Sequence, residues 1–240
     1  QLAMAVLPDP VEAAQLAANG LLAALDALAK AHDVETLQRS ERLQQALYEI
    51  ADLAGSALEM QDVLARIHAV VGGLMTAENF YIVLYDDLSE TLRFLYFVDE
   101  LDPWEADPDA ALHVSDMPSS LTIALLREGR PMLGPSAQLR REHGVDDGDL
   151  QHGPDSADWL GVPMHRDGRV CGAIVVQSYD VPGRYTDDDR ALLEFVAQHI
   201  LTALDRKQAQ AELERRVDSR TLELQQANLV LQAEIAERAR

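Results

Sequence analysis

The sequence has a single cysteine and few basic or aromatic residues, and these shortages exclude several classes of protein. Cys171 alone rules out an internal disulfide and fits a reducing compartment. Twenty Lys and Arg stand against 41 Asp and Glu, which argues against nucleic-acid binding because phosphate contacts need clustered cations. Aromatic residues make up 5% of the chain, too few for a base-stacking surface. We therefore expect a cytoplasmic protein that binds no nucleic acid.

A long uninterrupted apolar run and a secretion signal are also missing. The Ala- and Leu-rich stretch 11–30 is long enough for a membrane helix, but Glu12, Asp26 and several uncharged polar residues interrupt it. No basic region precedes it, as a signal peptide would require. We expect a soluble helix with no membrane contact. Since the chain begins without Met and ends within a helical pattern, we interpret it as a piece of a longer protein.

Recognisable catalytic motifs are absent from the sequence as well. It contains no Gly-rich phosphate loop, cysteine cluster or nucleophile elbow. One polar loop holds two histidines and three aspartates, namely His143, Asp146, Asp147, Asp149 and His152. Their spacing matches no Ca or Zn template, so a solvated loop is favoured over a metal site. His199 is better explained as a buried, hydrogen-bonded side chain than as a haem ligand. We expect no catalytic residue and no metal, and the cofactor is unknown.

The C-terminal residues form one continuous helical pattern. It begins at Thr186, where Asp189 completes a capping box, and no Pro or Gly follows up to Arg240. A wide apolar face comes first, made by Leu192, Phe195, Val196 and His199. The pattern then narrows to alternating steps of four and three residues, at Val217, Thr221, Leu224, Asn228, Leu231 and Ile235. This predicts a helix that docks on a domain and then pairs with its twin as a two-stranded coiled coil, with Asn228 fixing the register.

The preceding residues alternate between helical and strand patterns. Helices are predicted over 11–30 and 33–53, and a third has its apolar side between Val63 and Leu74. Two hairpins are predicted, the first from strands 80–85 and 91–98 and the second over 159–179, where Asp167-Gly168 is a favoured turn pair. These elements indicate an α+β fold with an antiparallel sheet of about five or six strands.

The segment between the two hairpins is more irregular. An acidic loop over 99–109 leads to a short helix over 121–127, capped by Ser119 or Ser120 and closed by Gly129. Residues 131–133 are predicted to form an edge strand. A polar excursion over 134–155 follows, with one helical turn near 138–142.

Six short motifs in this region carry a family resemblance. They are NFYIVLYD at 79–86, YFVDE at 96–100, DWLGVP at 158–163, GAIVVQSY at 172–179, Tyr185-Thr186 and FVAQHI at 195–200. Together they resemble bacterial GAF sensor domains over residues 41–206. The resemblance implies a central antiparallel sheet with helices on one side and a ligand pocket on the other. It divides the chain into an N-terminal helical segment (1–40), a GAF-like domain (41–206) and a coiled-coil linker (207–240).

The functional residues of characterised GAF subgroups are only partly present. The cyclic-nucleotide motif has Phe, three residues and Asp-Glu, whereas this chain has Tyr185, Asp189 and Arg190 at those places. Bilin-binding relatives need a pocket cysteine, but Cys171 lies in a predicted core strand. Free methionine sulfoxide reductases need several cysteines for their redox cycle, and one is not enough. The domain is therefore expected to be non-catalytic.

A pocket is the remaining functional hypothesis for the domain. In this fold five side chains from strands or strand ends are expected near one another: Tyr81, Phe97, Asp99, Trp159 and His165. Aromatic walls with a few polar groups suit a small organic ligand. The alternative is that the aromatic residues simply fill the core.

The tail suggests what the domain regulates. Residues 213–240 are similar to linkers ahead of GGDEF diguanylate cyclase domains, and such linkers also precede histidine kinases. We therefore expect a homodimeric sensor that transmits a small-ligand or conformational signal to a C-terminal diguanylate cyclase, in cyclic-di-GMP signalling. The sensor region of a histidine kinase and a ligand-free dimerisation scaffold are the alternatives.

Overall fold

The computed structural model describes residues 10–102, 104, 106–146 and 155–238. The chain divides into two compact units, 1–47 and 48–240. Helix α1 (Pro10–Gly55) supplies the described part of the first unit, and its last two turns belong to the second. The prediction of separate helices over 11–30 and 33–53 is wrong. The helix runs on because the sequence has no Pro or Gly between residues 21 and 54 that would interrupt it.

A six-stranded antiparallel sheet forms the centre of the second unit, as the sequence predicted. Its strands are β1 (Asn79–Asp86), β2 (Thr91–Val98), β3 (Leu112–His113), β4 (Met132–Pro135), β5 (Asp158–Arg166) and β6 (Arg169–Ser178). They are ordered β3-β2-β1-β6-β5-β4, and every neighbouring pair is antiparallel. The β5–β6 turn is made by Asp167 and Gly168, both at positive φ (53° and 77°), as expected for a tight Asp-Gly hairpin.

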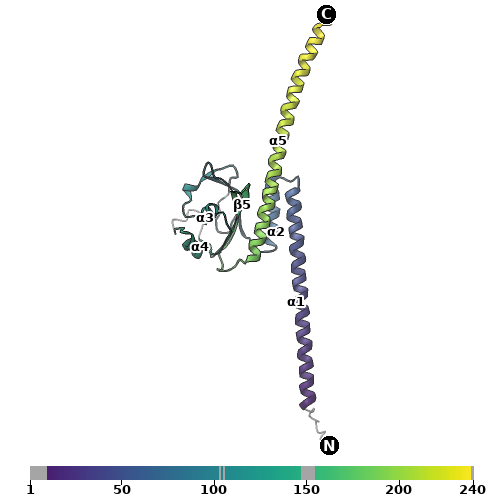
Figure 1. Ribbon diagram of the computed structural model, residues 1–240, viewed down its shortest axis with the longest axis vertical. Coiled ribbons are helices and arrows are strands. Elements are labelled where there is room, and N and C mark those ends of the chain that lie inside the picture. The colour runs from purple at the N-terminus through teal and green to yellow at the C-terminus, as the bar shows by residue number, and fades with distance from the viewer. Residues whose placement is uncertain (1–9, 103, 105, 147–154, 239–240) are drawn as a thin grey trace. The chain divides into compact units, whose positions relative to one another are not determined.

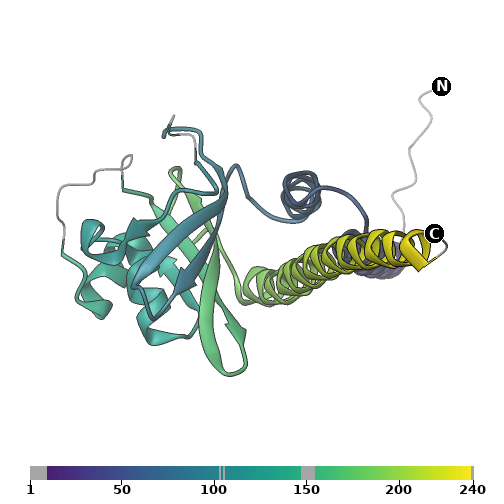
Figure 2. The same ribbon diagram turned by 90° about the horizontal axis from the view of Figure 1, so that it is seen from above.

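Helices cover both faces of this sheet (Figure 1, Figure 2), whereas the resemblance implied helices on one side and a ligand pocket on the other. The short helices α3 (Leu121–Glu128) and α4 (Ser136–His143) lie on one face, while α2 (Met60–Gly72) and α5 (Asp187–Arg238) lie on the other. Strand residues alternate between the two layers. Tyr81 and Val175 pack in the hydrophobic cluster with α3, whereas Phe80 stacks on His68 of α2, with ring centroids 4.7 Å apart.

Helix α5 is tied to strand β5 near both ends of that strand. The buried carboxylate of Asp158, which begins β5, accepts a hydrogen bond from the backbone N–H of Tyr185 (3.0 Å), just before the helix. Arg166, which ends β5, forms an ion pair with Asp205. A helical segment of about 20 residues rises roughly 30 Å, close to the length of a nine-residue strand, so α5 runs along β5.

The two predicted zones of α5 are distinct in the structure. The first contains the buried side chains of Leu192, Leu193, Val196, Ile200 and Leu204. Beyond Leu204 no described α5 side chain is buried. The second zone holds the predicted coiled-coil seam, the row of residues from Val217 to Ile235 expected to face a second copy, and its Val217, Leu224 and Leu231 are each more than half exposed. The side chain of Ile235 lies outside the described residues. Among the described helices, none is long and apolar enough to span a membrane.

The start of α5 confirms the predicted capping box. The backbone N–H of Asp189 donates to Thr186 Oγ1 (3.3 Å), and that of Thr186 donates to Asp189 Oδ2 (2.8 Å). Further along, His199 is half-buried and its Nδ1 bonds to the carbonyl of Phe195 (3.0 Å). This histidine is therefore hydrogen-bonded, as expected, within its own helix.

The segment between the hairpins differs from the prediction in two places. Ser120 occupies the N-cap position of α3, but its side chain makes no capping hydrogen bond. Gly129 closes α3 in the left-handed conformation, as predicted, at φ 64°. The excursion over 134–155 contains a full helix, α4, where one turn was expected. Leu139 and Arg140 bury their side chains, and Gly144 ends the helix in the left-handed conformation (φ 63°).

Candidate functional site

An aromatic cluster lies between the sheet and the helices α3 and α4. Tyr81 of β1 is at its centre, with ring centroids 5.7 Å from Phe94 and 5.9 Å from Phe97. Trp104 meets the same two phenylalanines edge-on, at 5.0 and 5.1 Å. Trp159 belongs to the same hydrophobic cluster and is 2% exposed. Such offset and edge-to-face contacts are the favoured geometries of aromatic pairs.

A bulge in β2 brings both of its phenylalanines to this cluster. Ile82 pairs with Tyr96 but the next residue, Val83, pairs with Phe94, so Leu95 has no partner on β1. The extra residue reverses the alternation, and side chains three apart then point to the same face. Tyr96 consequently faces the other layer, where its hydroxyl bonds to His68 Nδ1 (3.0 Å).

Gly161 makes room for the indole of Trp159. A Cβ atom at this glycine would lie 2.2 Å from Cη2 of Trp159 and 2.9 Å from a methyl of Leu125. Only a residue without a side chain allows the ring to lie over its own strand at this point. The Trp159–Gly161 pair thus fixes the β5 side of the cluster.

Polar groups meet the cluster at two places. The Tyr81 hydroxyl shares a hydrogen bond with Thr122 Oγ1 of α3 (2.9 Å). Burial raises the pKa of Tyr81 above its ordinary value, and the bond to Thr122 opposes this shift. On α4 the buried guanidinium of Arg140 donates to Asp155 (3.0 to 3.2 Å) and to the carbonyl of Ser119 (2.7 Å). The positive charge of Arg140 favours the ionised phenol and so lowers the pKa of Tyr81. Arg140 is therefore close enough to act electrostatically on the cluster.

Asp99 organises a third polar group, directly after β2. Its carboxylate accepts hydrogen bonds from the Tyr179 hydroxyl (2.9 and 3.1 Å) and from Gln177 Nε2 (2.8 Å). It also accepts the backbone N–H groups of Leu101 and Asp102, both at 2.9 Å. Burial raises the pKa of Tyr179, and the hydrogen bond to the Asp99 carboxylate raises it further. The loop after β2 is therefore fastened to the end of β6.

The structure brings together four of the five predicted site residues. Tyr81, Phe97 and Trp159 share the hydrophobic cluster, and the charge of Asp99 acts on the Tyr81 phenol. His165 does not join them: it is exposed and pairs with Val170, whereas Trp159 pairs with Gln177 toward the opposite end of the two strands. Six residues along a strand span about 20 Å. The binding role of all five residues remains a prediction.

Sequence reasoning missed several residues of this site. Gln177 of β6 and Tyr179, directly after the strand, continue the alternation of Val175, so the strand period contained a signal for them. The bulge at Leu95 shifts the register of β2, so the strand period did not indicate which face of the sheet Phe94 occupies. Trp104 and Arg140 lie in irregular acidic and polar segments, where no periodicity indicates the direction of a side chain.

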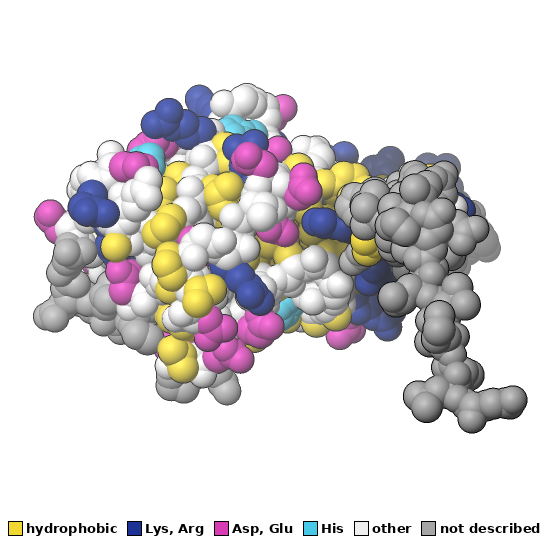
Figure 3. Space-filling view, turned by 90° about the horizontal axis from the view of Figure 1, so that it is seen from below, with side chains coloured by type: hydrophobic (Ala, Val, Ile, Leu, Met, Phe, Trp, Pro, Cys, Tyr) yellow, Lys and Arg dark blue, Asp and Glu magenta, His cyan; other side chains and the backbone are white. Residues whose placement is uncertain are grey.

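Cys171 and the acidic and histidine side chains bear on two kinds of chemistry, a reactive thiol and a metal site. Burial raises the pKa of the Cys171 thiol, which is the opposite of nucleophile activation. No group of three or more His, Cys, Asp or Glu able to hold a metal occurs among the residues that the structure describes. The polar loop weighed above as a metal site begins at His143, which pairs with Glu128. Of its other residues, Asp147, Asp149 and His152 lie outside the described residues. Acidic and basic side chains are interspersed over the described part of the face in Figure 3.

Replacing Asp99 by Asn should lower the pKa of Tyr179 toward its ordinary value. The substitution removes both the negative charge and the charge-assisted bond that favour the neutral phenol. In a spectrophotometric titration one tyrosine should then ionise at lower pH than in the original protein. Asp109→Asn, in the exposed loop, is the matched control and should leave the titration unchanged. Identical curves for the Asp99 variant and the control would contradict the described network.

Comparison with known proteins identifies the domain. A sequence profile of the GAF domain matches residues 57–205, more than half of the chain. No protein of curated function matches the sequence at a significant level.

Solved structures show the same fold at low sequence identity. The GAF domain of a phosphoenolpyruvate-protein phosphotransferase (ptsP) from Coxiella burnetii matches with a TM-score of 0.58 and 15% identity, over 72% of this chain and 98% of that chain. The corresponding Acinetobacter domain gives 0.54 and 17%, over 69% and 94%. Free methionine-R-sulfoxide reductase from Neisseria meningitidis, in complex with its substrate, gives 0.53 and 15%, over 70% and 91%. These likenesses agree with the sheet order and the helical layers, and the profile match over residues 57–205 establishes that the chain belongs to the GAF domain family.

Proposed function

We propose that this chain is the sensor region of a dimeric cytoplasmic signalling protein. A small organic molecule binds at the aromatic cluster, and helix α5 carries the resulting change toward a C-terminal output domain. The observation that carries this proposal is the continuity of α5. The same helix is buried against the sheet domain up to Leu204 and presents an exposed apolar seam from Val217 onward.

Strand β5 provides a short route between the cluster and this helix. Consecutive residues of a strand point to opposite faces, so Trp159 lies in the cluster while Leu160, which is fully buried, faces the α5 layer. The ties from Asp158 to Tyr185 and from Arg166 to Asp205 join the strand to the helix at both ends. A displacement of Trp159 by a ligand would therefore be passed to α5 through one strand.

The composition of the cluster supports a small organic ligand. Its rings supply apolar walls, while the Tyr81–Thr122 hydroxyls, Arg140 and Asp99 supply donors, acceptors and charges of both signs. Binding sites for small molecules combine a mainly apolar lining with a few fixed polar groups. The regulatory role agrees with membership of the GAF family.

The exposed part of α5 supports dimerisation. Val217, Leu224 and Leu231 follow steps of seven residues, and a row of exposed aliphatic side chains on a long helix favours pairing with a second copy. We propose a diguanylate cyclase as the output because residues 213–240 resemble linkers that precede such domains. A histidine kinase is the second candidate for the output.

One observation favours a different class of function, the ligand-free scaffold. The rings of Tyr81, Phe94 and Phe97 already pack on one another at 5.7 to 5.9 Å, as they would in an ordinary core. In a scaffold, the sheet domain would serve only to space two helical stalks.

Release of a bound molecule distinguishes a sensor from a scaffold. We expect the protein, purified and then denatured, to release a small molecule in stoichiometric amount, detected by mass spectrometry. Tyr81→Phe keeps the ring but removes the hydroxyl at the cluster, and should reduce the amount recovered. Tyr48→Phe, at a tyrosine that is 79% exposed, is the matched control. Absence of any released molecule would favour the scaffold, and equal recovery from both variants would remove Tyr81 from the site.

Dimerisation should depend on the exposed seam of α5. A chain ending at Lys207 lacks the whole seam and should dissociate at higher concentration than the full chain, as measured by light scattering. Leu224→Glu places a charge in the seam and should weaken the dimer, whereas Leu222→Glu, beside the seam and similarly exposed, should not. A chain ending at Lys207 that dimerises as tightly as the full chain would show that other surfaces hold the pair.

A further inference from the structure

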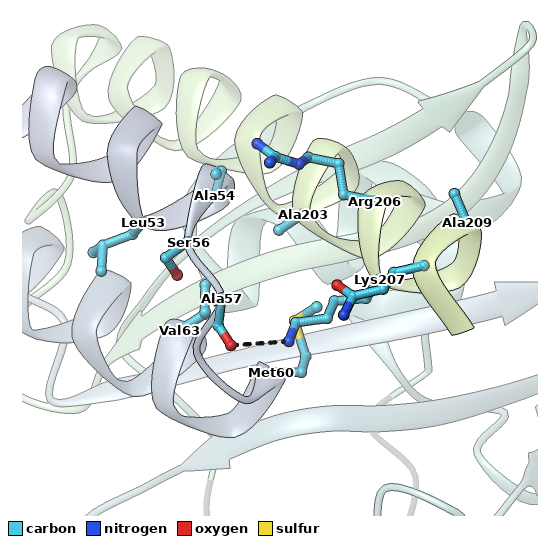
Figure 4. A pocket seen from close by; sticks show the side chains of 12 residues that line it. Leu53, Ala54, Ser56, Ala57, Met60, Val63, Ala203, Arg206, Lys207 and Ala209 are labelled. Carbon is cyan, nitrogen blue, oxygen red and sulfur yellow. Dashed lines mark hydrogen bonds between the residues drawn. The ribbon is translucent and has the colours of Figure 1, made fainter. Parts of the chain in front are cut away.

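A pocket lies where helices α1, α2 and α5 meet, away from the aromatic cluster. Figure 4 shows its lining, which comes from the end of α1, the turn into α2, the first turn of α2 and one segment of α5. Its volume is about 330 Å³, at the lower end of the range for small-molecule sites. All of its lining residues belong to the unit 48–240.

The inner part of this pocket is apolar. Leu53, Val63 and Ala203 line it with buried side chains, and the half-buried Met60 adds a flexible thioether. These groups come from all three helices. They would accommodate a short aliphatic chain.

The α5 side of the pocket is cationic. Arg206, Lys207 and Gln210 lie three, four and seven residues after Ala203, so the four residues share one face of the helix. In a chain of net charge −21, the pocket has two cations in its lining and no Asp or Glu. The charge at this place therefore opposes that of the chain as a whole.

Arg206 differs from other arginines of the same helix. Arg190, Arg215, Arg216 and Arg220 each pair with a carboxylate three or four residues away. Within the described part of the chain, Arg206 has no ion pair or hydrogen bond, and its guanidinium lies beside Gly55. Lys207 has only a long contact, 3.5 Å, from Nζ to the carbonyl of Ala57. Both cations retain donors for an anion.

A buried hydroxyl completes the polar side. Ser56, in the turn after α1, lines the pocket, and its Oγ is inaccessible to solvent without a hydrogen-bond partner among the described residues. Buried polar groups are nearly always hydrogen-bonded, so this hydroxyl has an open hydrogen-bonding capacity that a ligand in the pocket would fill once the side chain turns toward it. A carboxylate oxygen is a suitable acceptor for this hydroxyl.

We propose that this pocket binds a small monocarboxylate with a short aliphatic body. The carboxylate pairs with Arg206 and Lys207 and accepts a bond from Ser56, and the aliphatic part lies against Leu53, Met60 and Val63. The pocket lies where α5 leaves the sheet domain. Leu204 is the last described residue of α5 that is buried, and Arg206 and Lys207 follow shortly after it. An occupant joins the α1–α2 turn to the base of the exposed helix. This inference does not depend on a ligand at the aromatic cluster.

Titration with hexanoate tests the proposal on the full chain. Hexanoate should give saturable shifts of the backbone amide signals of Ser56, Ala57 and Ala209, with hexan-1-ol and inorganic phosphate giving far smaller ones. Arg206→Gln should weaken hexanoate binding at least about tenfold, since it removes a charged hydrogen-bond donor. Arg215→Gln, an exposed arginine of α5 outside the pocket, is the matched control and should bind hexanoate like the original chain.

Several outcomes would overturn the proposal. Equal shifts with hexanoate and hexan-1-ol would show an apolar hollow without anion recognition, and equal binding by Arg206→Gln would remove the proposed cation. Shifts that appear on dilution of the protein, and not with hexanoate, would show that a second copy of the chain covers the pocket. Because Arg206 is exposed, its variant should keep the original circular dichroism spectrum, so loss of binding would not reflect unfolding.

Discussion

The attachment of helix α5 along strand β5 is the constraint on which the rest of this structure depends. The strand begins with a buried carboxylate, Asp158, that holds the backbone of Tyr185, and it ends with Arg166 paired to Asp205. Between these ties the apolar face of the helix is buried. A buried carboxylate is costly to keep unless it is hydrogen-bonded, so the bond to Tyr185 stabilises both the strand end and the start of the helix.

This attachment gives the two layers of the domain different roles. The layer with α3 and α4 holds the aromatic cluster and its polar groups, including the Asp99 carboxylate that fastens the loop after β2. The layer with α2 and α5 holds the helix that continues beyond the domain. The proposed monocarboxylate pocket lies in this second layer, next to the point where α5 becomes exposed. Ligands in the two layers would act on the same helix from different places.

Much of the fold follows from local patterns, and the exceptions have physical causes. The alternation over 79–98 and 158–178, the Asp-Gly turn and the capping box at Thr186 each specify their element from a few neighbouring residues. The continuity of α1 was missed although the sequence has no Pro or Gly between residues 21 and 54. For the site, Tyr81, Phe97 and Trp159 were recognised from strand residues. Phe94 required knowledge of the bulge at Leu95, and Arg140 required the tertiary position of α4, which no periodicity gives.

The most direct test of signal transfer through α5 is to change the rotation of the seam relative to the sheet. In a fusion of this chain at Arg240 to a diguanylate cyclase domain, deleting four residues within 208–216 rotates the downstream helix by about 40° net, and deleting seven by about 20°. Both variants keep the seam from Val217 onward, so both should stay dimeric. We expect cyclic-di-GMP synthesis to change more for the four-residue deletion than for the seven-residue one. Equal synthesis by the original fusion and both deletions would show that α5 is a passive tether.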